Sequence, residues 1–202
     1  GGAVCVSPQD SDIPRYPPFV KGLPVAAPAR IVATQSELIA RLQDGLAFTD
    51  ARFATLVRPI IERYAAFVHL LPASEAHHHR GAGGLFRHGL EVAFHAAQAS
   101  QGRIFALDRS PAERRELEPR WRLAAGLAGL CHDAGKPVSD LSVSDRAGST
   151  SWRPLLEDVE TAYNQIRQGR PVALPPKSSS VQQWGEKLAA WAQSATAVAA
   201  LP

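Results

Sequence analysis

Five of the seven histidines in this 202-residue sequence gather in two places. They are His77, His78, His79, His88 and His132. The last of these is followed directly by Asp133. Imidazole and carboxylate groups together form the ordinary ligand set for first-row divalent metals. The residue types therefore predict a site for a divalent transition metal of the Mn, Fe or Zn class, assembled from two separate segments of the chain.

The pair His132-Asp133 lies at the end of an expected helix, residues 121–134, that is otherwise almost continuously apolar. Burying a carboxylate there is costly unless a cation or hydrogen bonds compensate, and a helix C-terminus already disfavours negative charge. A positive group should therefore lie against Asp133. A metal is one candidate, and Lys136 in a purely structural role is the other.

The three consecutive histidines belong to a segment, residues 73–84, that has three glycines and no apolar period, so it is predicted to be a loop. The permissive backbone of these glycines lets the loop fold back over the helix that carries His88. A solvated loop without metal is the alternative. His69 and His95, each alone on an expected helix face, are interpreted as structural.

Apolar spacing predicts an all-α fold for the central part of the chain, residues 34–168. The expected helices cover residues 36–46, 49–71, 85–101, 121–134 and 155–168. Before them, residues 1–33 contain six prolines and are predicted to form an extended arm without a helix. Residues 169–180 resemble a linker, and residues 181–202 a C-terminal helix. Alternating residues also allow a small β-hairpin around 139–153.

Composition excludes several classes of protein. Apolar residues make up 45% of the chain, charged residues 20%, and the mean hydropathy is −0.13, which is typical of a soluble globular protein. The sequence has neither the run of about 20 apolar residues of a membrane span nor the features of a signal peptide. Cys5 and Cys131 are too few for a disulfide framework. We therefore expect a cytoplasmic protein without membrane insertion.

The formal net charge is +3, and residues 80–122 contain eight arginines against five acidic residues. That excess is compatible with contacts to nucleic-acid phosphates, whose affinity would fall steeply with salt. It is equally typical of a solvated helix with internal salt bridges. Charge alone does not decide between these interpretations.

The two histidine segments resemble a known signature. The stretch FRHGLEV at 86–92 followed by CHDAGK at 131–136 is similar to the H…HD pattern of the HD-domain metal-dependent phosphohydrolases, a mainly helical superfamily. The longer phrases HHHRGAGGLFRHGLEVA, at 77–93, and HDAGKPVSDLSVSD, at 132–145, resemble the N-terminal HD-type domain of relaxases from integrating conjugative elements and some plasmids (MobH class).

This resemblance covers about residues 30–160 and implies an HD-like helical bundle that holds one or two divalent metals. The implied metal ligands are His78, His79, His88, His132 and Asp133. HD enzymes usually complete the site with an aspartate in a later helix, and no such motif follows here. Asp158 is the candidate that we assign to this position.

A metal held by these residues would polarise a phosphoryl oxygen and activate water, so the expected substrate is a phosphoester. Lys136 could then stabilise phosphate charge during catalysis, and Arg87 could assist it. Arg80 and Arg87 could contact the phosphate bidentately. The tyrosines Tyr16, Tyr64 and Tyr163 could each form a covalent intermediate with DNA, but nothing in the sequence places one of them beside the metal.

The first functional hypothesis is a metal-dependent phosphodiesterase, or DNA-nicking relaxase module, of a conjugative element. Metal-activated water would attack a phosphodiester of single-stranded or nicked transfer-origin DNA. A second hypothesis is a nucleotide phosphohydrolase of the wider HD superfamily. A third is a non-catalytic docking module with a degenerate HD site that binds other proteins of the transfer machinery.

Overall fold

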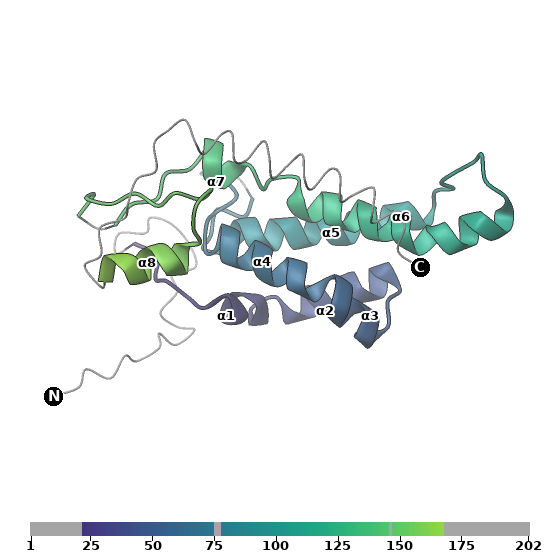
Figure 1. Ribbon diagram of the computed structural model, residues 1–202, viewed down its shortest axis with the longest axis horizontal. Helices are drawn as coiled ribbons and strands as arrows, with labels where there is room; N and C mark the ends of the chain where they lie inside the picture. The colour runs from purple at the N-terminus through teal and green to yellow at the C-terminus, as the bar shows by residue number, and fades with distance from the viewer. Residues whose placement is uncertain (1–21, 75–77, 146, 168–202) are drawn as a thin grey trace. The chain divides into compact units, whose positions relative to one another are not determined.

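The computed structural model describes residues 22–74, 78–145 and 147–167 (Figure 1). Its helices are α1 Pro28–Ala33, α2 Ser36–Leu46, α3 Asp50–Leu56, α4 Arg58–Val68, α5 Gly84–Gln101, α6 Pro111–Cys131, α7 Lys136–Ser139 and α8 Val159–Arg167. No β-strand occurs in these ranges, which confirms the all-α prediction. The hairpin expected around 139–153 is only a single antiparallel bridge between Ser144 and Ser151. None of the described helices is both long and apolar enough to cross a membrane.

The chain divides into two compact units, Gly1–Tyr163 and Asn164–Pro202. Only residues 164–167 of the second unit are described, so the account that follows concerns the first. The linker expected at 169–180 and the helix expected at 181–202 lie outside the described residues, as do the first 21 residues of the expected arm.

Pro28 and Pro59 each lie in the first turn of a helix, where the sequence predicted an arm without a helix and one continuous helix, respectively. The expected arm ends earlier than predicted, because Pro28 opens α1, whose Ile31 and Val32 are buried. The long helix expected over 49–71 is divided at Val57, and Pro59 lies in the first turn of α4. A proline in the first helical turn loses no hydrogen bond, since the amides there have no partner within the helix.

Helix α6 begins ten residues earlier than expected, at Pro111 rather than at Trp121. The Ser110 hydroxyl accepts a hydrogen bond from the amide of Glu113, and the Glu113 carboxylate accepts one from the amide of Ser110. This reciprocal capping box satisfies two amides of the first turn. Much of the insert that follows α5 is therefore helical.

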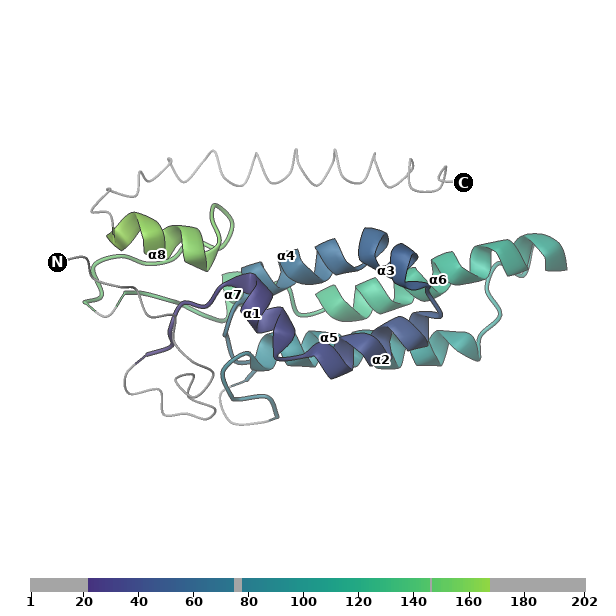
Figure 2. The same cartoon turned by 90° about the horizontal axis from the view of Figure 1, so that it is seen from below.

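Helix α5 lies at the centre of the first unit and contacts α2, α4 and α6 (Figure 2). Its inward face is fully buried at Leu85, Leu90, Ala93 and Ala97. Helix α6 packs on it through small residues, with Gly126 and Gly129 buried beside Leu130. A Cβ atom at Gly129 would lie 2.8 Å from the Val92 carbonyl oxygen and 3.0 Å from the backbone of Ala93. The backbones of α5 and α6 can approach this closely only because glycine is present.

His69 joins the segment before α1 to the end of α4. Its side chain is buried, and the Ala26 amide donates a hydrogen bond of 3.0 Å to its Nε2. Burial lowers the pKa of His69, although the Ala26 backbone and Asp158 oppose that shift. These contacts fit the structural role expected for His69.

Replacing Gly129 by alanine should destabilise the fold by about 1–3 kcal/mol, because the new methyl group must push α5 and α6 apart. Thermal or urea unfolding measures this loss. Gly102→Ala is the matched control, since nothing lies within 4 Å of its Cβ position and its φ is −89°. Equal stability of the two variants would show that the helix crossing is not close-packed at Gly129.

His69→Gln should flatten the pH dependence of stability. The lowered pKa of His69 means that the unfolded chain binds the proton more readily than the folded one. Its contribution is therefore complete above a pH of about 6.5 and falls as the pH drops through that value, by up to about 1.4 kcal/mol per pH unit. Urea titrations from pH 8 to pH 5 measure this difference. Parallel curves for the two proteins would contradict the assignment.

Candidate metal centre

Three side chains from two segments converge at one end of the α5–α6 pair. His88 comes from the second turn of α5, whereas His132 and Asp133 come from the turn that follows α6. One potential ligand atom of each lies within 4.8 Å of the other two. The Asp133 Oδ2 is 3.6 Å from Nε2 of His88 and 3.3 Å from Nε2 of His132. The structure thus brings together the three residues of the H…HD pattern.

The end of α6 fixes the orientation of the His132 ring. Its Nδ1 donates a hydrogen bond of 2.7 Å to the Gly129 carbonyl oxygen, one of the helix-end carbonyls left without an amide partner. With the proton on Nδ1, Nε2 keeps its lone pair and faces Asp133. Metal-binding histidines usually have this arrangement, in which a second hydrogen bond sets the tautomer.

Asp133 has a positive partner within the protein. The Lys136 Nζ lies 2.8 Å from its Oδ2 and also donates a hydrogen bond of 3.0 Å to the Ala73 carbonyl oxygen. The Asp133 side chain is 19% exposed. Burial acts to raise its pKa, but the Lys136 hydrogen bond and the charges of His132, Lys136 and His88 bring the pKa below its usual value. The carboxylate is therefore ionised at neutral pH.

His88 is kept neutral by its surroundings. Partial burial is the largest influence that lowers its pKa, and the neighbouring charges of His132 and His79 act in the same direction. Asp133 opposes this shift. A neutral imidazole is the form that binds metals, so His88 presents a suitable donor beside the Asp133 carboxylate.

The histidine loop folds back over α5, as the glycines suggested. The His79 carbonyl oxygen accepts a hydrogen bond from the Ala73 amide, and a Cβ atom at Gly84 would collide with that same oxygen. The His79 ring lies 5.3 Å from the His88 ring, centroid to centroid. His78 and Arg80 are exposed, and His77 lies outside the described residues. Of the two loop histidines that the structure describes, His79 alone approaches the three converging side chains.

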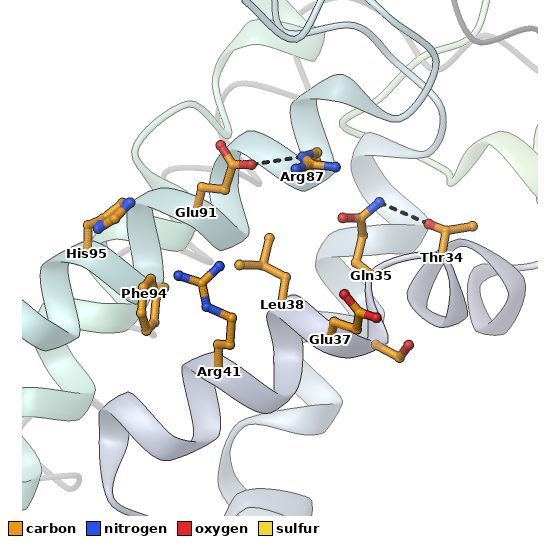
Figure 3. Close-up of a pocket in the computed structure, with 10 residues that line it drawn as sticks. Thr34, Gln35, Glu37, Leu38, Arg41, Arg87, Glu91, Phe94 and His95 are labelled. Atoms are coloured by element: carbon orange, nitrogen blue, oxygen red, sulfur yellow. Dashed lines mark hydrogen bonds and ion pairs between the residues drawn. The ribbon is translucent and has the colours of Figure 1, made fainter.

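Glu91 is a site residue that the sequence analysis missed. Its Oε2 lies 3.0 Å from Nε2 of His79, and its Oε1 accepts a hydrogen bond of 2.8 Å from Nε of Arg87 (Figure 3). The spacing from Arg87 to Glu91 is four residues, which places both on one face of a helix and was the available signal. Because Nε2 of His79 faces this carboxylate, His79 could bind a metal beside His88 only through Nδ1 or after leaving Glu91.

Asp158 has a different place from the one assigned to it. Its Oδ1 accepts a hydrogen bond of 2.7 Å from the Thr161 amide in the first turn of α8, so it caps that helix. Asp158 is exposed and does not belong to the three-residue cluster. Among residues 22–74, 78–145 and 147–167, no fourth ligand joins the three.

The tyrosines do not supply an obvious nucleophile. Tyr64 is 5% exposed, and its hydroxyl has no hydrogen-bond partner among the described residues. Burial, reinforced by the charges of Cys131 and Asp133, strongly raises the pKa of Tyr64, so its hydroxyl stays protonated. Tyr163 is 45% exposed on α8, and Tyr16 lies outside the described residues.

The three converging groups suit a divalent metal in type and orientation. Two imidazoles, of which His132 has its tautomer set by the Gly129 carbonyl, share a small volume with one ionised carboxylate. Three protein ligands leave positions open for substrate and water. The Lys136 ammonium group lies at the same carboxylate oxygen and would compete with such a cation. Both predicted partners of Asp133, a metal ion and Lys136, are thus physically compatible with this site.

One comparison with known proteins covers most of the chain. A family model described as "Putative helicase" (TraI_2) matches residues 22–197. Linear gramicidin synthase subunits B and C of Brevibacillus parabrevis are 50% and 52% identical over 44 residues, and chondramide synthase cmdD of Chondromyces crocatus is 46% identical over 43. These matches cover 21–22% of this chain and 1% of each synthase, so they carry no functional conclusion. No solved structure matches.

Lys136→Gln should separate the two partners of Asp133. Without metal, the variant should lose about 1–2 kcal/mol of stability, because a partly buried carboxylate loses a charged hydrogen-bond donor. With Mn²⁺, its melting temperature should rise by more than that of the wild type, since the competing ammonium charge is gone. Arg58→Gln, which removes an exposed charge on α4, is the control. If Lys136→Gln is less stable than the wild type but Mn²⁺ changes the melting temperature of neither protein, Lys136 is the sole partner of Asp133.

Proposed function

The chain belongs to the family described as "Putative helicase" (TraI_2), and from this premise we propose that it is a metal-dependent phosphodiesterase module that cleaves DNA in conjugative transfer. The convergence of His88, His132 and Asp133 within 4.8 Å carries the proposal. Their assignment as metal ligands is likewise proposed. The family supports a DNA substrate, and the ligand chemistry supports hydrolysis of a phosphoester.

A divalent metal bound by these residues supplies a Lewis acid that polarises a phosphoryl oxygen and lowers the pKa of water. His88 and His132 contribute neutral nitrogen donors, and Asp133 contributes the negative charge that holds a cation. The hydrogen bond from His132 to Gly129 keeps the imidazole orientation fixed before substrate arrives. Preorganised ligands of this kind avoid the cost of rearrangement during the reaction.

Two cationic side chains lie where a phosphate would approach. The Lys136 Nζ is 2.8 Å from the Asp133 carboxylate and could turn toward a non-bridging phosphate oxygen. Arg87 precedes His88 in the sequence, and its Nε is held by Glu91 while its side chain is 57% exposed. Its terminal nitrogens can therefore contact a phosphate of the DNA strand next to the scissile one, which would help to orient the scissile bond. Arg80, exposed on the histidine loop, is a further phosphate contact in this proposal.

The proposal is tested by hydrolysis of bis(p-nitrophenyl) phosphate and of an end-labelled single-stranded oligodeoxynucleotide, with Mn²⁺ present. His132→Ala/Asp133→Ala should reduce turnover by more than about a hundredfold. Replacing residues that only hydrogen-bond to metal ligands already lowers metal affinity or activity by about 10- to 100-fold, and this variant removes two ligands themselves. Asp108→Ala, which removes a carboxylate that is 77% exposed and distant in sequence, should retain full turnover.

Other outcomes would contradict the proposal in distinct ways. Hydrolysis of dTTP but of neither phosphodiester would favour a nucleotide phosphohydrolase. Oligonucleotide or protein binding that is equal in wild type and double variant, with no turnover by either, would favour the non-catalytic docking module. Circular dichroism of the double variant establishes that lost turnover does not reflect unfolding.

A further inference from the structure

A pocket of about 500 Å³ lies between the start of α2 and the first half of α5, the helix that also carries His88. In Figure 3, Arg41 reaches into it from α2, whereas Arg87 and Glu91 border it from α5. Gln35 and Glu37 lie on the α2 side, near Arg87 in the same view. Its size is within the range of small-ligand sites, about 300–1,000 Å³.

Arg41 is held in place for binding an anion. Its guanidinium carbon lies 4.5 Å from the centre of the Phe94 ring, so the planar group rests on an aromatic surface. Phe94 is itself buried against the core. Stacking of this kind limits the motion of the arginine and leaves the N–H groups at its edge available. No ion pair of Arg41 occurs in the part of the chain that the structure describes.

The pocket is connected to the metal centre through one face of α5. Glu91 borders the pocket and also contacts His79, whose ring neighbours that of His88. Arg87 borders the pocket and directly precedes His88 in the sequence. His95, also at the pocket, is seven residues from His88, or about 10 Å along the helix axis. A ligand in the pocket would therefore lie along the same helix as the centre, within about 10 Å of it along the helix axis.

The lining combines groups of opposite charge. Arg41 and Arg87 provide two guanidinium groups for a phosphate, and the side chains of Gln35 and Glu37 provide an amide and a carboxylate. A nucleotide requires this mixture, because it presents phosphate oxygens at one end and base N–H and carbonyl groups at the other. An inorganic anion would use the arginines alone.

We propose that this pocket binds one nucleotide of the DNA strand, with its phosphate against Arg41 and Arg87, and so positions the neighbouring phosphodiester at the metal centre. The inference rests on the proposed function, since it names a subsite for the same substrate. Glu91 is a positioning residue in this arrangement, because it holds Arg87 toward the pocket and His79 toward the centre.

Fluorescence anisotropy with a labelled oligothymidylate of about twelve nucleotides tests the proposal, with the wild-type chain in EDTA so that no turnover occurs. Arg41→Gln should weaken binding about tenfold, as expected for the loss of one charge-assisted contact. The slope of log affinity against log salt should decrease by about 0.7, the value for one phosphate contact on a single strand. Arg41→Lys should keep the slope, because it keeps the charge.

Arg63→Gln, which removes an exposed arginine on α4, is the matched control and should bind like the wild type. If Arg41→Gln binds the oligonucleotide with the affinity and the salt dependence of the wild type, the pocket assignment is wrong. Hydrolysis of bis(p-nitrophenyl) phosphate tests the proposed function independently of that result. Arg41-dependent binding of dTMP, without binding of the oligonucleotide, would also overturn it in favour of a free nucleotide.

Discussion

The close approach of α5 and α6 is the constraint on which the rest of the structure depends. Glycines permit it at two places: Gly129 lies against the backbone of Val92 and Ala93, and Gly89 lies against the Tyr64 ring and the Leu130 carbonyl oxygen. At the second place, the helix that carries His88 meets the helix end that carries His132 and Asp133. A larger side chain at either glycine would move His88 away from His132 and Asp133. Packing of small residues thus sets the geometry of the proposed chemistry.

The charge of Asp133 is the second determinant of the site. A partly buried carboxylate at a helix end requires a positive partner, and Lys136 meets that requirement within the protein. The same carboxylate lies within reach of two imidazoles, which makes the site suitable for a cation that would compete with the ammonium group. Lys136 also bonds the Ala73 carbonyl oxygen, so its displacement by a cation would release a contact to the segment that leads into the histidine loop. Binding of a cation at Asp133 would therefore be linked to the position of that loop through one lysine.

Much of this arrangement could be predicted from the sequence, because it depends on local signals. The apolar helix before His132-Asp133 and the glycines beside the histidine loop were both visible as patterns. The features that were not predicted depend on contacts between segments far apart in the sequence or on a short capping pattern. The role of Glu91 depends on the contact that His79 makes when its loop folds over α5. The role of Asp158 as a helix cap depends on where α8 begins. Ser110 and Glu113 did carry a capping signal, so the early start of α6 could have been predicted.

Metal analysis of the purified chain tests the central claim most directly. The wild type and the His132→Ala/Asp133→Ala variant are loaded with Mn²⁺, Fe²⁺ or Zn²⁺, freed of excess ion, and compared by elemental analysis after both are shown to fold. The account predicts near-stoichiometric metal in the wild type and little in the variant. Equal metal content in the two proteins, or none in the wild type after loading with each ion, would contradict it and leave Lys136 as the partner that explains Asp133.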